Sequence, residues 1–224
     1  MSLADAVLED AVRGVRVAHD AAGLTAIRDP DCAAVLWQRA APQGVEAWLD
    51  GLPTEQLPTA RLVLRTGDVR RTVDEVCNAC GTPQCAERNA LVDDVGALAD
   101  AFGDLLGTQK IRVRLDVVTA NMCPKFHIDA VPARLICTYR GTGTQYGLTR
   151  DGADPDPIAT VPTGSAVVLR GTEWPNAPLP DLRHRSPPIA GTGETRLLLV
   201  IDPVAEVEDA PKQSFEAPLP RPMN

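Results

Sequence analysis

The sequence predicts an α+β fold, in which helices of the N-terminal half pack against a jelly roll or similar barrel formed by the C-terminal half. In the first half, apolar residues recur at the three- and four-residue spacings of helices, most clearly in residues 85–106. In the second half, apolar and polar residues alternate, as in the half-buried strand predicted at residues 110–118. Turns rich in Gly and Pro separate the later segments, which favours a series of short strands.

The helical region is predicted to span residues 1–106. Its candidate helices are residues 5–22, 32–37, 45–52, 69–80 and 85–106. Gly14 weakens the first of these patterns, and Asp31 is placed to cap the second. Residues 61–65 are too few to distinguish a strand from a helix. The last two helices have the strongest patterns, and a Gly-Thr-Pro-Gln turn joins them.

The barrel is predicted to span residues 107–203. Its candidate strands are residues 110–118, 134–140, 144–148, 165–170 and 196–202. The Pro-rich end of the chain, residues 204–224, is predicted to be disordered. With 224 residues, the chain is long enough for one domain with an appended region.

Composition and charge exclude several classes of function. The net charge of −8 repels phosphate backbones and anionic membranes, so we expect no nucleic-acid or membrane partner. Three Trp, three Phe and two Tyr are too few for a base-stacking platform. The N-terminus lacks the basic and apolar parts of a signal peptide, which predicts a cytoplasmic protein. The sequence indicates no particular oligomeric state.

Two of the three histidines occur in a pattern typical of a metal site. One residue separates His127 from Asp129, so in a strand both side chains point to the same side. His184 follows in the predicted barrel, and Arg196 opens the last predicted strand. A jelly roll places an early and a late strand next to each other. We therefore expect these distant residues to meet at one mouth of the barrel.

Two imidazoles and one carboxylate bind a metal on one face and leave the other face open, which suits non-haem Fe(II), a cosubstrate and O₂. We predict that His127, Asp129 and His184 are the metal ligands and the catalytic centre. Arg196 would bind the carboxylate of a 2-oxoacid such as 2-oxoglutarate, because its guanidinium group offers two parallel donors. Arg134 and Arg140, on another predicted strand, could equally hold that carboxylate.

Several of these residues also have a purely structural interpretation. His184 could be a loop histidine bound to a backbone carbonyl, and Arg196 could pair with Glu194 or Asp202 at the surface. Tyr139 could donate a hydrogen bond to the cosubstrate, or to any partner at the edge of the core.

Residues 123–141 resemble the hallmark of a bacterial family known as domain of unknown function 1826; they read Cys-Pro-Lys-Phe-His-Ile-Asp-Ala-Val-Pro-Ala-Arg-Leu-Ile-Cys-Thr-Tyr-Arg-Gly. The likeness continues through residues 164–171, 184–188 and 196–202, and it covers roughly residues 25–203. In the N-terminal half it is loose and rests mainly on residues 36–39.

The His-x-Asp, His and Arg layout of that family is similar to the layout of 2-oxoglutarate/Fe(II) dioxygenases and cupins. The resemblance implies a cupin-like double-stranded β-helix at residues 107–203. With it we expect an Fe(II) oxygenase that oxidises a small or amino-acid-like substrate. The resemblance also implies a link to zinc homeostasis, which keeps Zn²⁺ as an alternative metal. The alternative functions are a zinc-binding protein without turnover and a cupin-like metalloenzyme that does not use 2-oxoglutarate.

Three cysteines, Cys77, Cys80 and Cys85, surround the predicted helix–helix turn and could bind Zn²⁺, with Cys32 as a fourth ligand. The usual four-ligand spacing is missing, so we favour thiols packed in a helical hairpin. Cys123 precedes His127 by four residues and could approach the metal, although we favour a structural role there too.

Overall fold

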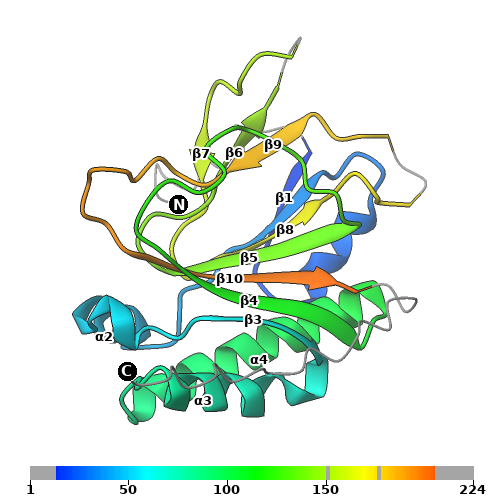
Figure 1. Ribbon diagram of the computed structural model, residues 1–224. Helices are drawn as coiled ribbons and strands as arrows, with labels where there is room; N and C mark the ends of the chain where they lie inside the picture. The colour runs from blue at the N-terminus through cyan, green and yellow to red at the C-terminus, as the bar shows by residue number, and fades with distance from the viewer. Residues whose placement is uncertain (1–13, 150–151, 176–177, 205–224) are drawn as a thin grey trace, which may run out of the picture.

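A seven-stranded sheet and a three-stranded sheet form the framework of the computed structural model, which describes residues 14–149, 152–175 and 178–204 (Figure 1). The large sheet has the order β1-β2-β8-β5-β10-β4-β3, and the small sheet has the order β7-β6-β9. All pairs are antiparallel except β1 with β2. The strands are β1 Val15–Ala18, β2 Ala34–Trp37, β3 Ala60–Arg65, β4 Lys110–Val118, β5 Ala133–Arg140, β6 Gln145–Leu148, β7 Ala159–Thr160, β8 Ala166–Arg170, β9 Leu182–Arg185 and β10 Arg196–Pro203.

A helical layer covers one face of the large sheet (Figure 1). Helices α3, Val69–Ala79, and α4, Ala86–Leu106, form an antiparallel hairpin below the sheet, and the shorter α2, Val45–Gly51, lies beside them. Three 3₁₀ turns complete this layer: η1 Ala22–Arg28, η2 Thr54–Gln56 and η3 Thr66–Asp68. The helical layer leaves the opposite face of the large sheet to the small sheet.

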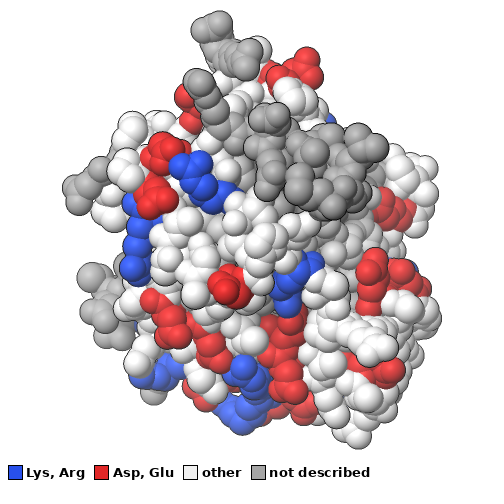
Figure 2. Space-filling view, turned by 180° about the vertical axis from the view of Figure 1, so that it is seen from behind, with Lys and Arg blue, Asp and Glu red and all other residues white. Residues whose placement is uncertain are grey.

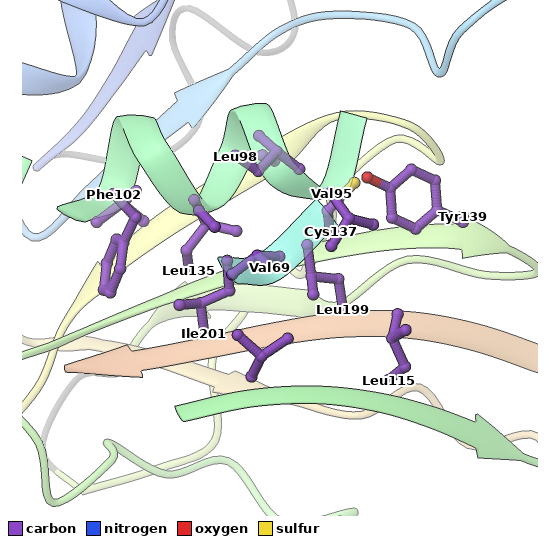
Figure 3. Packing of buried hydrophobic residues seen from close by; sticks show 14 of the residues in the cluster. Val69, Val95, Leu98, Phe102, Leu115, Leu135, Cys137, Tyr139, Leu199 and Ile201 are labelled. Atoms are coloured by element: carbon purple, nitrogen blue, oxygen red, sulfur yellow. The ribbon is translucent and has the colours of Figure 1, made fainter. Parts of the chain in front are cut away.

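Alternation along the strands divides the interior into two cores. On β5, Leu135, Cys137 and Tyr139 point toward α4, where they pack with apolar side chains such as Phe102 (Figure 3). Ile136 points the other way, into a second core between the two sheets that includes Tyr146 of the small sheet. Each fully buried apolar side chain stabilises the fold by roughly 1.5–3 kcal/mol.

Most of the predicted elements are confirmed. The structure has the helices expected near residues 45–52, 69–80 and 85–106, and it has all five predicted strands with ends shifted by at most a residue or so. Residues 61–65, which the sequence left undecided, lie in strand β3.

Two predicted helices are wrong where the structure describes them. Residues 15–18 and 34–37 are the strands β1 and β2. They pair at the edge of the large sheet, and the burial of Ala34, Val35 and Leu36 between β1 and β8 outweighs their weak helical pattern. Together with β3, these strands place part of the 1–106 region inside the same sheet as the predicted barrel, so this region is not purely helical.

Some predictions fall outside the described residues, namely the start of the first helix at residues 5–13 and the tail at 205–224. Within the described part of the chain, no helix has the length and apolar character that crossing a membrane requires. Acidic and basic side chains are interspersed on the face shown in Figure 2, and no continuous basic surface is visible among its described residues.

Candidate metal centre

His127 and His184 lie directly opposite each other as an isolated antiparallel pair at the edge of the small sheet. The His127 N–H donates to the His184 carbonyl over 3.0 Å, and the His184 N–H donates to the His127 carbonyl over 3.1 Å. The ring centroids are 4.5 Å apart. Both rings therefore project from one hydrogen-bonded pair, and the predicted meeting of the two histidines is present in the structure.

Asp129 completes the cluster. Its Oδ1 lies 3.7 Å from His127 Nε2, and its Oδ2 lies 3.1 Å from His184 Nε2. The possible ligand atoms of the three residues all lie within 4.8 Å of one another. In the described part of the chain, this is the one group of three or more His, Cys, Asp or Glu residues arranged to hold a metal ion.

The surroundings of the two histidines suit metal binding. His127 Nδ1 lies 2.8 Å from the Lys125 carbonyl oxygen, which accepts hydrogen bonds but cannot donate one. This contact places the proton of a neutral ring on Nδ1 and leaves the Nε2 lone pair facing Asp129. Burial lowers the pKa of His184 from its ordinary value, although Asp129 opposes the shift. A neutral imidazole is the form that a metal requires.

An ion-pair network fixes the carboxylate of Asp129. Arg134 Nη1 donates to Asp129 Oδ1, while Arg134 Nε and Nη2 donate to the two oxygens of Asp202 over 2.6 and 3.0 Å. Burial raises the pKa of Asp129, but its contacts with His184 and Arg134 more than offset this and hold that pKa below its usual range. Arg134 thus holds two carboxylates of the protein, which leaves it less free for a cosubstrate than predicted.

Arg196 has an unsatisfied donor next to this cluster. Its Nε donates to the Thr142 carbonyl over 2.6 Å and its Nη1 donates to Ser186 Oγ over 2.7 Å, but the buried Nη2 has no partner among the described residues. Burial lowers the pKa of Arg196 to about 10, against the attraction of Glu194, so the group stays charged at neutral pH. Neither Glu194 nor Asp202 forms an ion pair with Arg196 in the described structure, contrary to the structural alternative.

A cavity of about 80 Å³ lies beside the two histidines and is bordered by Arg134 and Arg196. His127, His184, Arg134, Arg196 and Cys123 line it, together with residues that the sequence analysis did not single out: Arg114, Asp116, Met122, Ile136, Thr144, Arg185, Ser186, Leu198 and Val200. The alternation of residues 110–118 places Arg114 and Asp116 on the polar face of the predicted half-buried strand. In the structure this polar face lies between the two sheets.

Tyr139 does not reach the cavity. It differs from Arg134 by an odd number of positions along β5 and therefore points to the helical side of the sheet. There its hydroxyl donates to Asp94 Oδ2 over 2.5 Å, and the residue is fully buried. The predicted contact with a cosubstrate is wrong.

The cysteines do not form a metal site within the described residues. Cys77 is buried, and Cys85 Sγ accepts a hydrogen bond from the Arg88 N–H over 3.4 Å at the start of α4. Cys123 lines the cavity but is not part of the ligand group.

A known protein-family model matches the chain. The family model described as "Protein of unknown function (DUF1826)" matches residues 18–202, which is most of the chain. The chain belongs to this family. No curated protein sequence is significantly similar to this DUF1826 member.

Solved structures show what the DUF1826 chain is similar to in fold. One is the dioxygenase for auxin oxidation from rice, with a TM-score of 0.51 and 16% identity over 87% of this chain and 84% of that one. Another is the dioxygenase for auxin oxidation 1 from Arabidopsis thaliana in a binary complex with 2-oxoglutarate, with a TM-score of 0.51 and 10% identity over 85% of this chain and 91% of that one. At these identities the likeness shows the fold alone: a mixed α/β fold that is similar to the jelly-roll folds of these dioxygenases.

Proposed function

We propose that this DUF1826 protein is a mononuclear non-haem Fe(II) oxygenase that uses 2-oxoglutarate to oxidise a small molecule. The observation that carries the proposal is the unpartnered Nη2 of Arg196, buried in the cavity that His127 and His184 also line. A buried cationic donor without a partner is costly, which indicates that an anion completes it.

The three candidate ligands fit a divalent metal. Two neutral imidazoles and one ionised carboxylate, with their ligand atoms within 4.8 Å of one another, are the donor set typical of non-haem Fe(II). Three protein ligands also leave positions on the metal for other molecules, unlike a closed four-ligand structural zinc site. The same donors bind Zn²⁺, so the metal itself has to be measured.

The residues of the chain have separate roles in this proposal. His127, Asp129 and His184 hold the metal, and Arg134 orients the Asp129 carboxylate. Arg196 binds the distal carboxylate of 2-oxoglutarate through Nη2, while Ser186 and the Thr142 carbonyl fix the plane of its guanidinium group. When bound, Fe(II) supplies the activation of O₂, with conversion of 2-oxoglutarate to succinate and CO₂ and transfer of one oxygen atom to the substrate.

The test is binding and conversion of 2-oxoglutarate by the full chain. We expect Fe(II)-dependent formation of succinate, which is lost in His184→Ala and retained in His19→Ala, because His19 is exposed and outside the cluster. Arg196→Met should weaken the binding of 2-oxoglutarate roughly 10–100-fold, since a hydrogen bond to a charged group contributes about 1.5–3 kcal/mol. Arg196→Lys should recover part of that loss, and Arg65→Met, at an exposed arginine, should change nothing.

Absence of 2-oxoglutarate binding to the metal-loaded wild-type protein would contradict the proposal. Copurified Zn²⁺ without any turnover would favour the zinc-binding alternative. Turnover of some substrate that ignores 2-oxoglutarate and survives Arg196→Glu would favour a cupin-like metalloenzyme.

A further inference from the structure

Two charged residues that line the cavity, Arg114 and Asp116, are not part of the candidate metal centre. Arg114 and Asp116 are two positions apart on β4, so both side chains point from the same face of the large sheet into the space between the sheets. The residues that alternate with them, Val113 and Leu115, pack against the helical layer. Two charged side chains thus project into the space between the sheets, where the second apolar core also lies.

Each of these side chains has an atom whose hydrogen-bonding capacity the described residues do not use. Arg114 Nε and Asp116 Oδ2 are buried and have no hydrogen-bond partner among the described residues. Their mutual contact, between Arg114 Nη1 and Asp116 Oδ2, measures 3.8 Å, and Arg114 Nη2 lies 3.7 Å from Asp202 Oδ2. Both distances exceed that of a hydrogen bond, and Arg134 already binds both oxygens of Asp202. The pair therefore has capacity for a donor at Asp116 and an acceptor at Arg114.

The surrounding charges favour a ligand head group without net charge. Within this network, Arg114, Arg134 and the exposed Arg61 face the aspartates Asp116, Asp129 and Asp202. Two further arginines line the cavity: Arg185 donates to Gln145, and Arg196 is assigned to the carboxylate of 2-oxoglutarate. Adding a lone anion or cation here would leave one charge unbalanced in a poorly solvated site, which is costly. A zwitterion adds one charge of each sign, and its ammonium and carboxylate groups suit the two neighbouring side chains.

The rest of the cavity suits an apolar body. On β10, Leu198 lies opposite Asp116 and Val200 lies opposite Arg114, and Ile136 of β5 lies next to Val200. These three side chains and Met122 form the apolar lining. Arg196 lies opposite Val118, four residues along β4 from Arg114, or roughly 13 Å at the rise of a strand. The two arginines therefore enter the cavity from different positions along the strands.

We propose that Arg114 and Asp116 form the substrate subsite of this cavity and bind a small apolar α-amino acid, with Arg114 on its carboxylate and Asp116 on its ammonium group. The bound amino acid is a substrate only if the proposed oxygenase function is correct, so this part of the inference rests on that function. The binding of the amino acid itself requires only the two side chains and the apolar lining.

The first experiment measures binding by calorimetry to the metal-free full chain, without 2-oxoglutarate. The probes are L-alanine, L-valine, L-leucine and L-methionine, together with two analogues of leucine: 4-methylpentanoate, which lacks the ammonium group, and 3-methylbutylamine, which lacks the carboxylate. We expect at least one amino acid to bind. For leucine we expect each analogue to bind at least tenfold more weakly, since each leaves one charge of the pair unpaired. Failure of all four amino acids, or equal binding of leucine and both analogues, overturns the proposal.

Substitutions test which side chain binds the ammonium group and which binds the carboxylate. Asp116→Asn keeps the size of the side chain and should weaken amino-acid binding at least tenfold while leaving 4-methylpentanoate unaffected. Arg114→Met should have the converse effect and leave 3-methylbutylamine unaffected. Arg112→Met is the matched control, because Arg112 lies two residues away on β4 but lines a different cavity. If Arg112→Met weakens binding as much as Arg114→Met, the assignment to this cavity is wrong. Circular dichroism checks that each variant is folded, and the ligand series on the wild-type protein decides the question if Arg114→Met does not fold.

The outcome is separable from that of the proposed function. Amino-acid binding without any 2-oxoglutarate turnover would support the subsite and contradict the oxygenase. Turnover of 2-oxoglutarate that no amino acid stimulates, with no binding in calorimetry, would contradict the subsite and leave the oxygenase standing.

Discussion

Arg134 connects the candidate metal centre to the large sheet, because it binds the partly buried carboxylate of Asp129 and the buried carboxylate of Asp202. Replacing it by Met would leave Asp202, which is 2% exposed, without its bidentate partner. We expect Arg134→Met to lower the free energy of unfolding by about 3–5 kcal/mol, as measured by urea denaturation, because an uncompensated buried charge is left behind. Metal affinity should fall as well, since Asp129 loses the donor that orients it.

The double variant Arg134→Met/Asp202→Leu separates these two effects. It removes both charges of the Arg134–Asp202 pair, so most of the lost stability should return. Metal affinity should stay low, because Asp129 is still unsupported. Recovery of both properties together would show that Arg134 acts on the metal only through stability.

Tyr139 lies on the helical side of the sheet, and a substitution can test whether it affects 2-oxoglutarate. Its hydroxyl binds Asp94, which Arg39 also holds through two contacts of 2.5 Å. We expect Tyr139→Phe to lower the free energy of unfolding by about 1–2 kcal/mol, because Asp94 loses one of three donors. The affinity for 2-oxoglutarate should not change, and a loss of tenfold or more would restore the sequence-based role of Tyr139.

The residues of the candidate metal centre could be selected from the sequence because histidines are rare in it and one of them is one residue away from an aspartate. His127, Asp129 and His184 stand out in a chain with three histidines, and a one-residue spacing has a definite meaning in extended backbone. The different roles of Arg134, Arg196 and Tyr139 could not be predicted from residue type and spacing. They depend on which partners each side chain meets, and Asp202, Asp94 and Ser186 are distant in sequence.

At the level of elements, long patterned segments were predicted well, and some short strands were missed although the equally short β6 was predicted. Helix α4 and strand β4 have enough residues to establish a period. Strands β1, β2 and β9 have four residues each, and their conformation depends on the neighbours they pair with in the sheets. The strand β9, which carries His184, was not predicted for this reason.

The α3–α4 hairpin is stabilised by Arg88 rather than by a metal at its cysteines. The buried Arg88 side chain donates to Asp74, Asn78 and the Thr82 carbonyl, which ties both helices to the turn between them. We therefore expect Cys77→Ser/Cys80→Ser/Cys85→Ser to bind the same number of metal ions per chain as the wild-type protein, as measured by elemental analysis.

The matched comparison for that variant is His127→Ala, which should lose its metal while the hairpin stays intact. A drop in metal content in the cysteine variant, with His127 unchanged, would show that the turn binds an ion after all.

The candidate metal ligands are attached to both sheets. His184 belongs to the small sheet, whereas Asp129 is tied through Arg134 to β5 and through Asp202 to β10 of the large sheet. An ion that binds all three ligands therefore joins the sheets, and it binds the folded chain in preference to the unfolded one. Metal binding should thus raise the stability of the whole fold, not only that of the loop at residues 123–129.

This stabilisation can be measured as a shift of the melting temperature of the metal-free protein on addition of Fe(II) without O₂. At a free metal concentration 100 times the Kd, binding contributes about 2.7 kcal/mol. In a domain of this size that corresponds to a rise of roughly 5–10 °C. His184→Ala should show no rise, because it removes the ligand on the small sheet, while His19→Ala should respond like the wild-type protein. A rise that persists in His184→Ala would mean that the ion binds elsewhere and does not join the two sheets.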